Sequence, residues 1–250
     1  MADSATWADD AKNAEKTGEW HYIDIPLSVE KGDAMTWCAP LGPSVNDKDR
    51  PGCIINALEY EWNLLRDQAQ PGPVRAKALR YVIHLTGDLH QPLHTEDNND
   101  KGGNCTSIQF FGETRTANLH SIWDYKIIAR DLEAKHTIQT AYAAALDRRF
   151  AAKWSGWGAA QADDFAGADF ARWTWEGHEL ARSVAYGDLK PPIPVEPPNP
   201  QAGCDAERDK IAGLHIAVAN SYLDATLPVI DEQLAKAGYR LAGLLNHTFQ

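Results

Sequence analysis

Hydrophobic side chains recur every three to four residues along most of this 250-residue chain, a spacing typical of amphipathic helices. A helix is predicted at 54–69, before a PGP turn, and another at 74–91, where Pro92 prevents further extension. The same periodicity predicts further helices near 119–130, 137–152, 168–186, 206–222 and 228–246. We therefore expect an all-α fold, a compact helical bundle.

Two segments depart from this helical pattern. TSIQFFG at 106–112 is short, apolar and followed by polar turn residues, so at most one small hairpin is expected. Six prolines within 187–203 predict a semi-rigid, non-helical connector. Only about 45 residues follow it, so we interpret it as a Pro-rich surface loop and residues 1–250 as a single domain.

Composition and charge narrow the possible functions. The chain is 44% hydrophobic and 24% charged, as globular proteins are, and no run approaches the ~18 apolar residues of a membrane-spanning helix. Its net charge of −11 lacks the basic surplus with which proteins usually bind the phosphates of nucleic acid. Bound metal could supply the missing charge, because two divalent ions would change −11 to −7 and three would change it to −5.

The four cysteines argue against a thiolate metal site. None forms a C-x-x-C pair, so neither a zinc–thiolate site nor a redox motif is indicated. Cys38 and Cys53 bracket a Gly/Pro/Asp loop and predict one disulfide, which leaves Cys105 and Cys204 for a second. Free buried thiols are the alternative, and an oxidising compartment would favour the disulfides.

Two histidine–aspartate pairs are the most informative feature of the sequence. His84 and Asp88, and likewise His120 and Asp124, are four residues apart in helical segments and so share a helix face. A single pair of this kind is usually a surface ion pair. His84, however, lies in an apolar segment where an unpaired imidazole is costly to bury, and metal ligation would offset that cost. A ligand set of nitrogen and oxygen with several imidazoles favours zinc.

Other polar residues of the chain indicate metal binding less strongly. Asp9 in TWADD and His21 in WHYID add one carboxylate and one imidazole, although a surface aspartate and a half-buried histidine are the ordinary alternatives. His94 follows the end of its helix and could turn toward a second ion. We expect His90 to lie on the far side of its helix, exposed, and Arg240 to make a structural hydrogen bond or ion pair.

The ordered motifs resemble a known enzyme family. TWADD, WHYID, YVIHLTGDLHQPLH, GGN, NLHSIWD and AGYRLAGLLN together resemble the zinc-dependent, single-strand-specific nucleases of fungi, plants and bacteria, the S1/P1 type. The resemblance covers nearly the whole chain, from residue 6 to about 246. It implies an all-α fold, related to zinc phospholipase C, with three zinc ions in a cleft. It also implies cleavage of single-stranded RNA and DNA to 5′-phosphates by a metal-bridging hydroxide, together with 3′-nucleotidase activity.

The resemblance also assigns zinc ligands. It implies that one zinc is held by two aspartates and two histidines, namely Asp9, His21, His84 and Asp88. It implies that a second is held by His94, His120 and Asp124, with Asp88 bridging toward a third.

Three further residues correspond to substrate-contacting positions of the family. Lys12 stands where relatives have an arginine and would stabilise the transition state, with a plain exposed lysine as the alternative. Tyr22 would stack on an unpaired base, with core packing as the alternative, and Asp24 would accept a hydrogen bond from the base edge.

The start of the chain departs from the family pattern. Relatives hold the third zinc partly through an N-terminal tryptophan and a nearby histidine, whereas in this sequence no tryptophan starts the chain, no histidine precedes His21 and no signal-peptide pattern is found. We expect that an N-terminal segment is missing, that an upstream extension encodes it, and that two zinc ions are well held by the chain as given. Family resemblance also implies a secreted or periplasmic protein.

Other functions remain open on the sequence alone. A zinc phospholipase C shares this ligand scheme, and a non-catalytic zinc- or nucleotide-binding module would fit an incomplete N-terminus. The WHYID block favours nucleotides, so the expected partners are single-stranded nucleic acid and nucleotides. No membrane or protein partner is indicated, and a monomer is expected.

Overall fold

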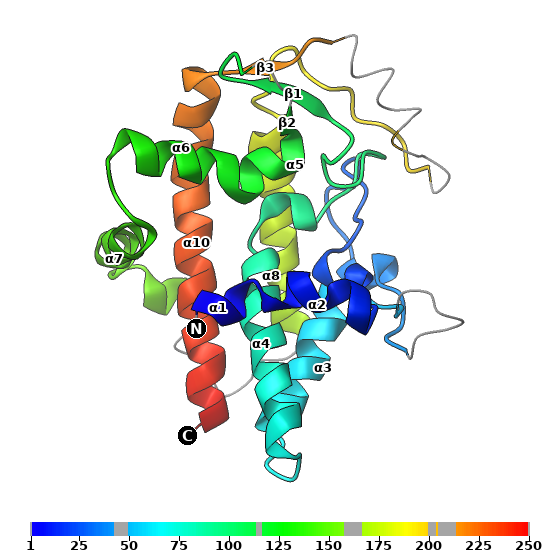
Figure 1. Ribbon diagram of the computed structural model, residues 1–250. Coiled ribbons are helices and arrows are strands. Elements are labelled where there is room, and N and C mark those ends of the chain that lie inside the picture. The colour runs from blue at the N-terminus through cyan, green and yellow to red at the C-terminus, as the bar shows by residue number, and fades with distance from the viewer. Residues whose placement is uncertain are drawn as a thin grey trace.

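The computed structural model describes residues 2–42, 50–113, 117–157, 167–199, 204 and 214–249, and it is mostly helical (Figure 1). The α-helices are α1 (Ala2–Ala5), α2 (Trp7–Glu15), α3 (Ile54–Arg66), α4 (Gly72–Asp88), α5 (Leu119–Ser121), α6 (Ile127–Ala134), α7 (Gln139–Phe150), α8 (Gly167–Leu180) and α10 (Asn220–Phe249). Single 3-10 turns are η1 (Gly18–His21), η2 (Ala34–Trp37), η3 (Pro92–His94) and η5 (Trp154–Trp157), and η4 (Ile122–Lys126) and η7 (Ala181–Tyr186) are π-helical. The predicted all-α class is confirmed, with only a small sheet added.

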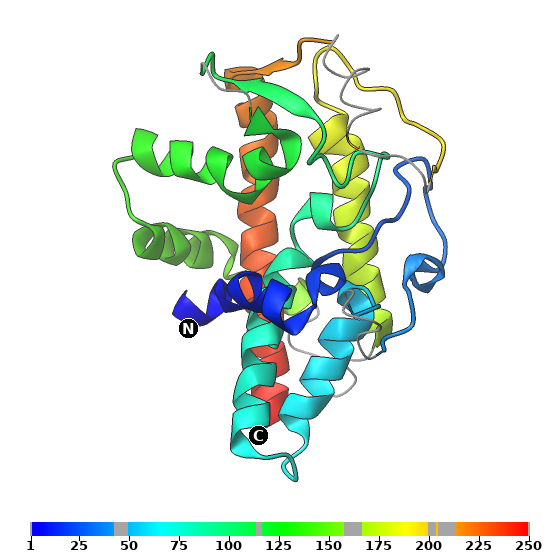
Figure 2. The same cartoon turned by 45° about the vertical axis from the view of Figure 1, so that its right-hand side comes forward.

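Long upright helices form the body of the molecule. α3 and α4 are consecutive and pack side by side as a hairpin, with α8 and α10 standing against them (Figures 1 and 2). α1 and α2 cross the front of α4, and α6 and α7 flank the upper part of α10. This arrangement brings the C-terminal end of α4 close to the N-terminal helices.

The core between these helices is built from large aromatic side chains. Trp20, Trp62 and Trp173 are almost completely buried in one apolar cluster with α3, α4 and α8. Burying a large apolar side chain contributes about 1.5–3 kcal/mol, so these residues fix the helices against one another. The rigid end of α4 can therefore hold side chains in a defined position.

The C-terminal helix is longer than the sequence predicts. α10 begins at Asn220 and continues through Pro228, where the prediction began only near 228. A proline inside a helix costs about 3 kcal/mol. Packing of α10 against α4 and α7 is extensive enough to outweigh that local preference.

The prediction of at most one small hairpin is confirmed among the described residues, and a third strand joins that hairpin in parallel. β1 (Ser107–Phe110) pairs antiparallel with β2 (Ala117–Asn118) and parallel with β3 (Ala217–Val218). β3 falls in the segment 206–222 that was predicted to be helical, of which 206–213 lie outside the described residues. Ile216 and Val218 are buried while Ala217 is exposed, and this alternation is that of a strand.

Both predicted disulfides are present, and they fix loops near the sheet and the N-terminal elements. They join Cys38 to Cys53 and Cys105 to Cys204. The part of the Pro-rich loop that is described, 187–199, is held by the amide side chains of Asn98 and Asn99, which donate to the carbonyl oxygens of Pro194 and Pro197. Its remaining residues, 200–203, lie outside the described part. No helix among the described residues is long and apolar enough to cross a membrane.

Candidate metal centre

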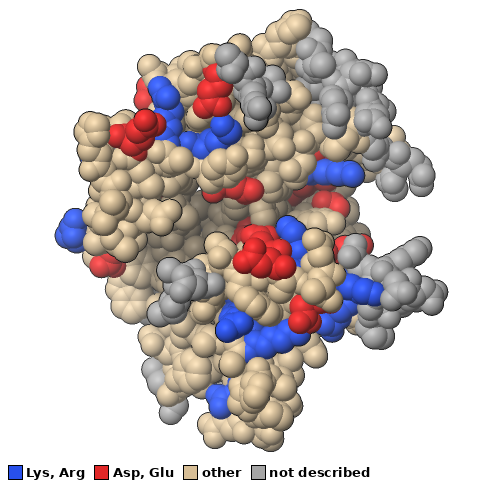
Figure 3. Space-filling model, in the orientation of Figure 1, with Lys and Arg blue, Asp and Glu red and all other residues tan. Residues whose placement is uncertain are grey.

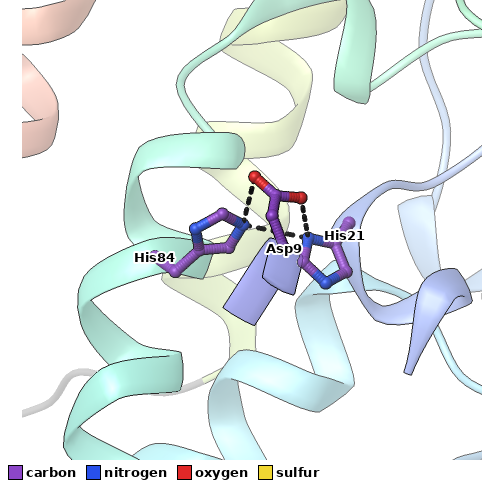
Figure 4. Close-up of side chains that lie close together, drawn as sticks. All are labelled: Asp9, His21 and His84. Carbon is purple, nitrogen blue, oxygen red and sulfur yellow. Dashed lines mark hydrogen bonds and ion pairs between the residues drawn. The ribbon is translucent and has the colours of Figure 1, made fainter. Parts of the chain in front are cut away.

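One group of ligand-type side chains gathers where α2, η1 and α4 meet. His21 Nδ1 and His84 Nε2 lie 3.0 Å apart, and each lies 2.9 Å from Oδ2 of Asp88. The two oxygens of Asp9 lie 3.7 Å from the same nitrogens, and Figure 4 shows its carboxylate facing both imidazoles. The helical spacing of His84 and Asp88 thus directs both toward one point, as the sequence predicts.

A second group lies where η3, α5 and η4 meet. His94 Nε2 lies 3.5 Å from Oδ1 of Asp124, and His120 Nε2 lies 3.4 Å from Oδ2 of the same carboxylate. The two imidazoles stack with centroids 4.8 Å apart. Asp124 lies in a π-helical segment rather than in the regular helix that the sequence predicts, and π turns are frequent at functional sites.

Asp88 connects the two groups. Its Oδ2 also lies 3.9 Å from His94 Nδ1. Although burial would raise the pKa of Asp88, the imidazoles of His94, His21 and His84 hold that pKa well below its usual range. Asp88 is therefore an ionised carboxylate placed between two sets of imidazoles.

Backbone carbonyls fix the orientation of three of the four imidazoles. The Nδ1 atoms of His84, His94 and His120 contact the carbonyl oxygens of Ala5 (2.5 Å), His21 (2.8 Å) and Gly102 (2.7 Å). A carbonyl only accepts, so each Nδ1 carries a proton and each Nε2 faces the group, where it presents a lone pair when the ring is neutral. This is the arrangement usual for metal-ligating histidines.

The resulting donor set fits a zinc ion. Lone pairs of imidazole nitrogens face carboxylate oxygens, which are also acceptors, so a proton or a cation must lie between them. Burial would lower the pKa of His94, but Asp88 and Asp124 raise it to about 9, which shows how strongly the site favours positive charge. The pKa of His120, in contrast, is lowered by burial and by His94, so protons alone do not satisfy both rings. Zinc commonly binds such imidazole and carboxylate ligands.

Both groups open into a cleft of about 1050 Å³, and acidic side chains gather around the hollow in the middle of this face (Figure 3). The cleft is lined by nine of the ten predicted site residues, namely Asp9, Lys12, His21, Tyr22, Asp24, Asp88, His94, His120 and Asp124. His84 lies behind them and is 5% exposed.

The three predicted substrate-contacting residues all line this cleft. Lys12 Nζ donates to Asp9 Oδ1 (3.1 Å), so it lies beside the first group. Tyr22 is 38% exposed, so it is not packed in the core. Partial loss of water around its carboxyl group, together with the negative charges of Asp97 and Glu19, raises the pKa of Asp24 to about 7.

One polar side chain at the site was not anticipated from the sequence. Gln91 Nε2 donates to Asp124 Oδ1 (2.7 Å), while its Oε1 accepts from the backbone N–H of Leu93 (2.6 Å). Gln91 therefore orients a carboxylate of the second group. Its position in HQPLH, three residues before the ligand-type His94, was the available signal.

The expectation that His90 is exposed is wrong. It is 4% exposed, and its Nε2 accepts from Arg240 (2.8 Å). Burial and Arg240 lower the pKa of His90 to about 3, so the ring is neutral. The structural role predicted for Arg240 is confirmed, because its Nη2 also donates to both carboxylate oxygens of Glu176. A helix face that would be exposed on an isolated helix is here covered by α10.

Comparison with known proteins agrees with this geometry. Nuclease S1 of Aspergillus oryzae is 29% identical over 253 residues, which cover 98% of this chain and 78% of that protein. Endonuclease 2 of Arabidopsis thaliana is 28% identical over 97% of this chain and 76% of its own length, and Nuclease P1 of Penicillium citrinum is 26% identical over 98% and 83%. The family model described as S1/P1 Nuclease matches residues 1–250. On the motifs, the site and this match over the whole length, the chain belongs to the S1/P1 nuclease family.

Proposed function

We propose that this protein hydrolyses phosphodiester bonds in single-stranded RNA and DNA, leaving 5′-phosphates, and removes 3′-phosphates from nucleotides, with zinc as its cofactor. The observation that carries the proposal is the convergence of imidazoles and carboxylates into two groups that share Asp88 at the base of one cleft. Its similarity to Nuclease S1 and Nuclease P1 supports the same function.

The residues would divide between two zinc ions. Asp9, His21, His84 and Asp88 would hold one, and His94, His120 and Asp124 the other. When bound, zinc supplies a Lewis acid for the phosphoryl oxygens and lowers the pKa of water to near 7. The chain's own contribution is to fix these ligands on the ends of rigid helices, with their rings oriented by backbone carbonyls.

Charge gives the metal site a second role, in substrate binding. The protein has a net charge of −11, and carboxylates surround the cleft, so phosphate is repelled unless local cations are present. Lys12 is a cationic side chain beside the first group, and its ammonium would offset charge on the phosphate during the reaction. Its contact with Asp9 also holds that carboxylate toward His21 and His84.

Recognition of an unpaired base would fall to the wall beside the first group. Tyr22 directly follows His21 and is exposed in the cleft, so a base stacked on it would lie next to the metal centre. Stacking tolerates any base but needs one that is not paired, which accounts for a single-strand preference. Asp24 would hydrogen-bond the edge of that base.

The cellular setting follows from the disulfides. Two disulfides form and persist in oxidising compartments, so we propose a secreted or periplasmic protein. We further propose that residues 1–250 act as a single nuclease domain and as a monomer, which size-exclusion chromatography with light scattering would test.

Metal content and product analysis on the same preparation test the proposal. The purified chain, dialysed against metal-free buffer, is examined by elemental analysis and then assayed on labelled single-stranded DNA, the matching duplex and phosphatidylcholine vesicles. We expect zinc in the protein, cleavage of the single strand in preference to the duplex, and 5′-phosphate ends. Phosphocholine release without nuclease activity would instead indicate a phospholipase C, and bound zinc with no turnover a binding module.

A further inference from the structure

The imidazole of His120 is held by a glycine loop. Its Nδ1 donates to the carbonyl oxygen of Gly102 (2.7 Å), and its backbone N–H donates to the carbonyl oxygen of Gly103 (3.3 Å). The direction in which Nε2 points, toward Asp124, therefore depends on where these two glycines lie.

Only glycine fits where the loop passes between the segment that carries His94 and the segment that carries His120. Gly102 and Gly103 have φ angles of 59° and 78°, in the left-handed region that favours glycine. A Cβ on Gly102 would lie 2.4 Å from the carbonyl oxygen of Leu93, the residue before His94. The loop thus touches the segment of one ligand and orients the ring of another.

A buried carboxylate anchors this loop from behind. Asp100 is fully buried, and its Oδ1 accepts from the backbone N–H of Gly103 (2.9 Å). Its Oδ2 accepts from the hydroxyl of Thr106, and the phenol of Tyr186 lies 2.9 Å from both carboxylate oxygens. A buried carboxylate is tolerated only when it is well hydrogen-bonded, and here its partners are the loop, the start of the sheet and η7.

We propose that Asp100 is a positioning residue for the second metal-ligand group, acting through Gly102 and Gly103 to aim His120 at Asp124. The inference rests on the proposed function, because it needs a metal in that group. Asp100 contacts no ligand-type side chain in the described residues, so its effect on the metal passes through the loop. Losses of about 10- to 100-fold in metal affinity are typical when such an outer partner is removed.

The test compares zinc affinity in Asp100→Ala and Asp100→Asn with that of the full wild-type chain. Competition with a chromogenic chelator measures both zinc ions, and the absorption spectrum of the cobalt-substituted protein reports the ligand geometry. Asp100→Ala should weaken one of two ions about 10- to 100-fold, change the cobalt spectrum and leave the other ion unchanged. Asp100→Asn should restore most of this affinity, because its amide oxygen can accept from Gly103 and its NH₂ group can face Thr106.

Asp231 provides a matched control. It is also a buried aspartate, bonded to Tyr142 and Arg149 away from the ligand groups, so Asp231→Ala should lose stability but keep both ions. If Asp100→Ala does not fold, Tyr186→Phe removes only the phenolic hydroxyl and should weaken the same ion less strongly.

Two results would overturn the positioning role: wild-type affinity for both ions in the variant that folds, or an equal loss in Asp231→Ala. A wild-type chain that binds no zinc would overturn the proposed function as well, so the two failures can be told apart.

Discussion

Replacing Asp124 with asparagine tests the second metal-ligand group most directly. The carboxylate oxygens of Asp124 lie 3.5 Å from His94 Nε2 and 3.4 Å from His120 Nε2, while Gln91 donates to Oδ1. Gln91 would retain the amide oxygen of an asparagine at the Oδ1 position, which leaves its NH₂ group facing His120. A neutral amide is a poor ligand for zinc.

The expected loss follows from the charge removed. Two unit charges about 4 Å apart interact by about 4 kcal/mol at an effective dielectric constant of about 20, and that energy is roughly a thousandfold in affinity. We therefore expect the second zinc to be lost on dialysis and the rate of phosphodiester cleavage to fall at least about a hundredfold, or about 2.7 kcal/mol. Folding should survive, because Asp124 is partly exposed and its contact with Gln91 is kept.

Zinc content, thermal denaturation and cleavage of single-stranded DNA are measured on the same sample, with and without added zinc. Asp169→Asn is the matched control, because Asp169 is comparably exposed (30% against 37%) and pairs with Arg172 on α8, away from the ligand groups. That variant should keep zinc and activity. Near-normal activity and full zinc content in Asp124→Asn would refute the reasoning, and His120 and Asp124 would then form an ordinary ion pair.

The remaining predictions concern the base-binding wall and the metal as a whole. Tyr22→Ala should raise KM for single-stranded DNA by a stacking increment of about 1–3 kcal/mol with unchanged zinc content, and an unchanged KM would contradict the stacking role. The pKa of Asp24 is raised to about 7, so the folded state keeps a proton that the unfolded state has released, and this residue's contribution to stability falls as pH rises from about 4 to 7. Asp24→Asn should therefore raise Tm more at pH 8 than at pH 4, and an equal change at both would be evidence against the raised pKa. Elemental analysis should find two zinc ions per chain, and EDTA should abolish activity and lower Tm until zinc is restored; less than one zinc per chain after dialysis would exclude the two-ion site.

Much of the candidate site could be predicted because its spacing is local. A helix places residues four apart on one face, so His84 with Asp88 and His120 with Asp124 could be paired before any tertiary contact was known. Burial of His84 among apolar neighbours was also visible in the sequence. The burial of His90 could not be predicted in this way. The same periodicity places His90 on a face that is exposed in an isolated helix, and Arg240 covers that face only in the folded protein.

The sequence by itself determined the helical class and the residues that could act as metal ligands, since periodicity, proline placement and ligand chemistry are properties of short segments. It predicted two disulfides but left free thiols as the alternative, and the structure decided between them. Only the tertiary structure decided that Asp88 lies between two groups, that the carbonyl oxygens of His21 and Gly102 orient ligand rings, and that a third strand joins the sheet. Every residue has a backbone carbonyl, so the sequence does not show which carbonyl will accept from a ligand histidine. Contacts between distant segments depend on how the buried faces of all the helices pack together.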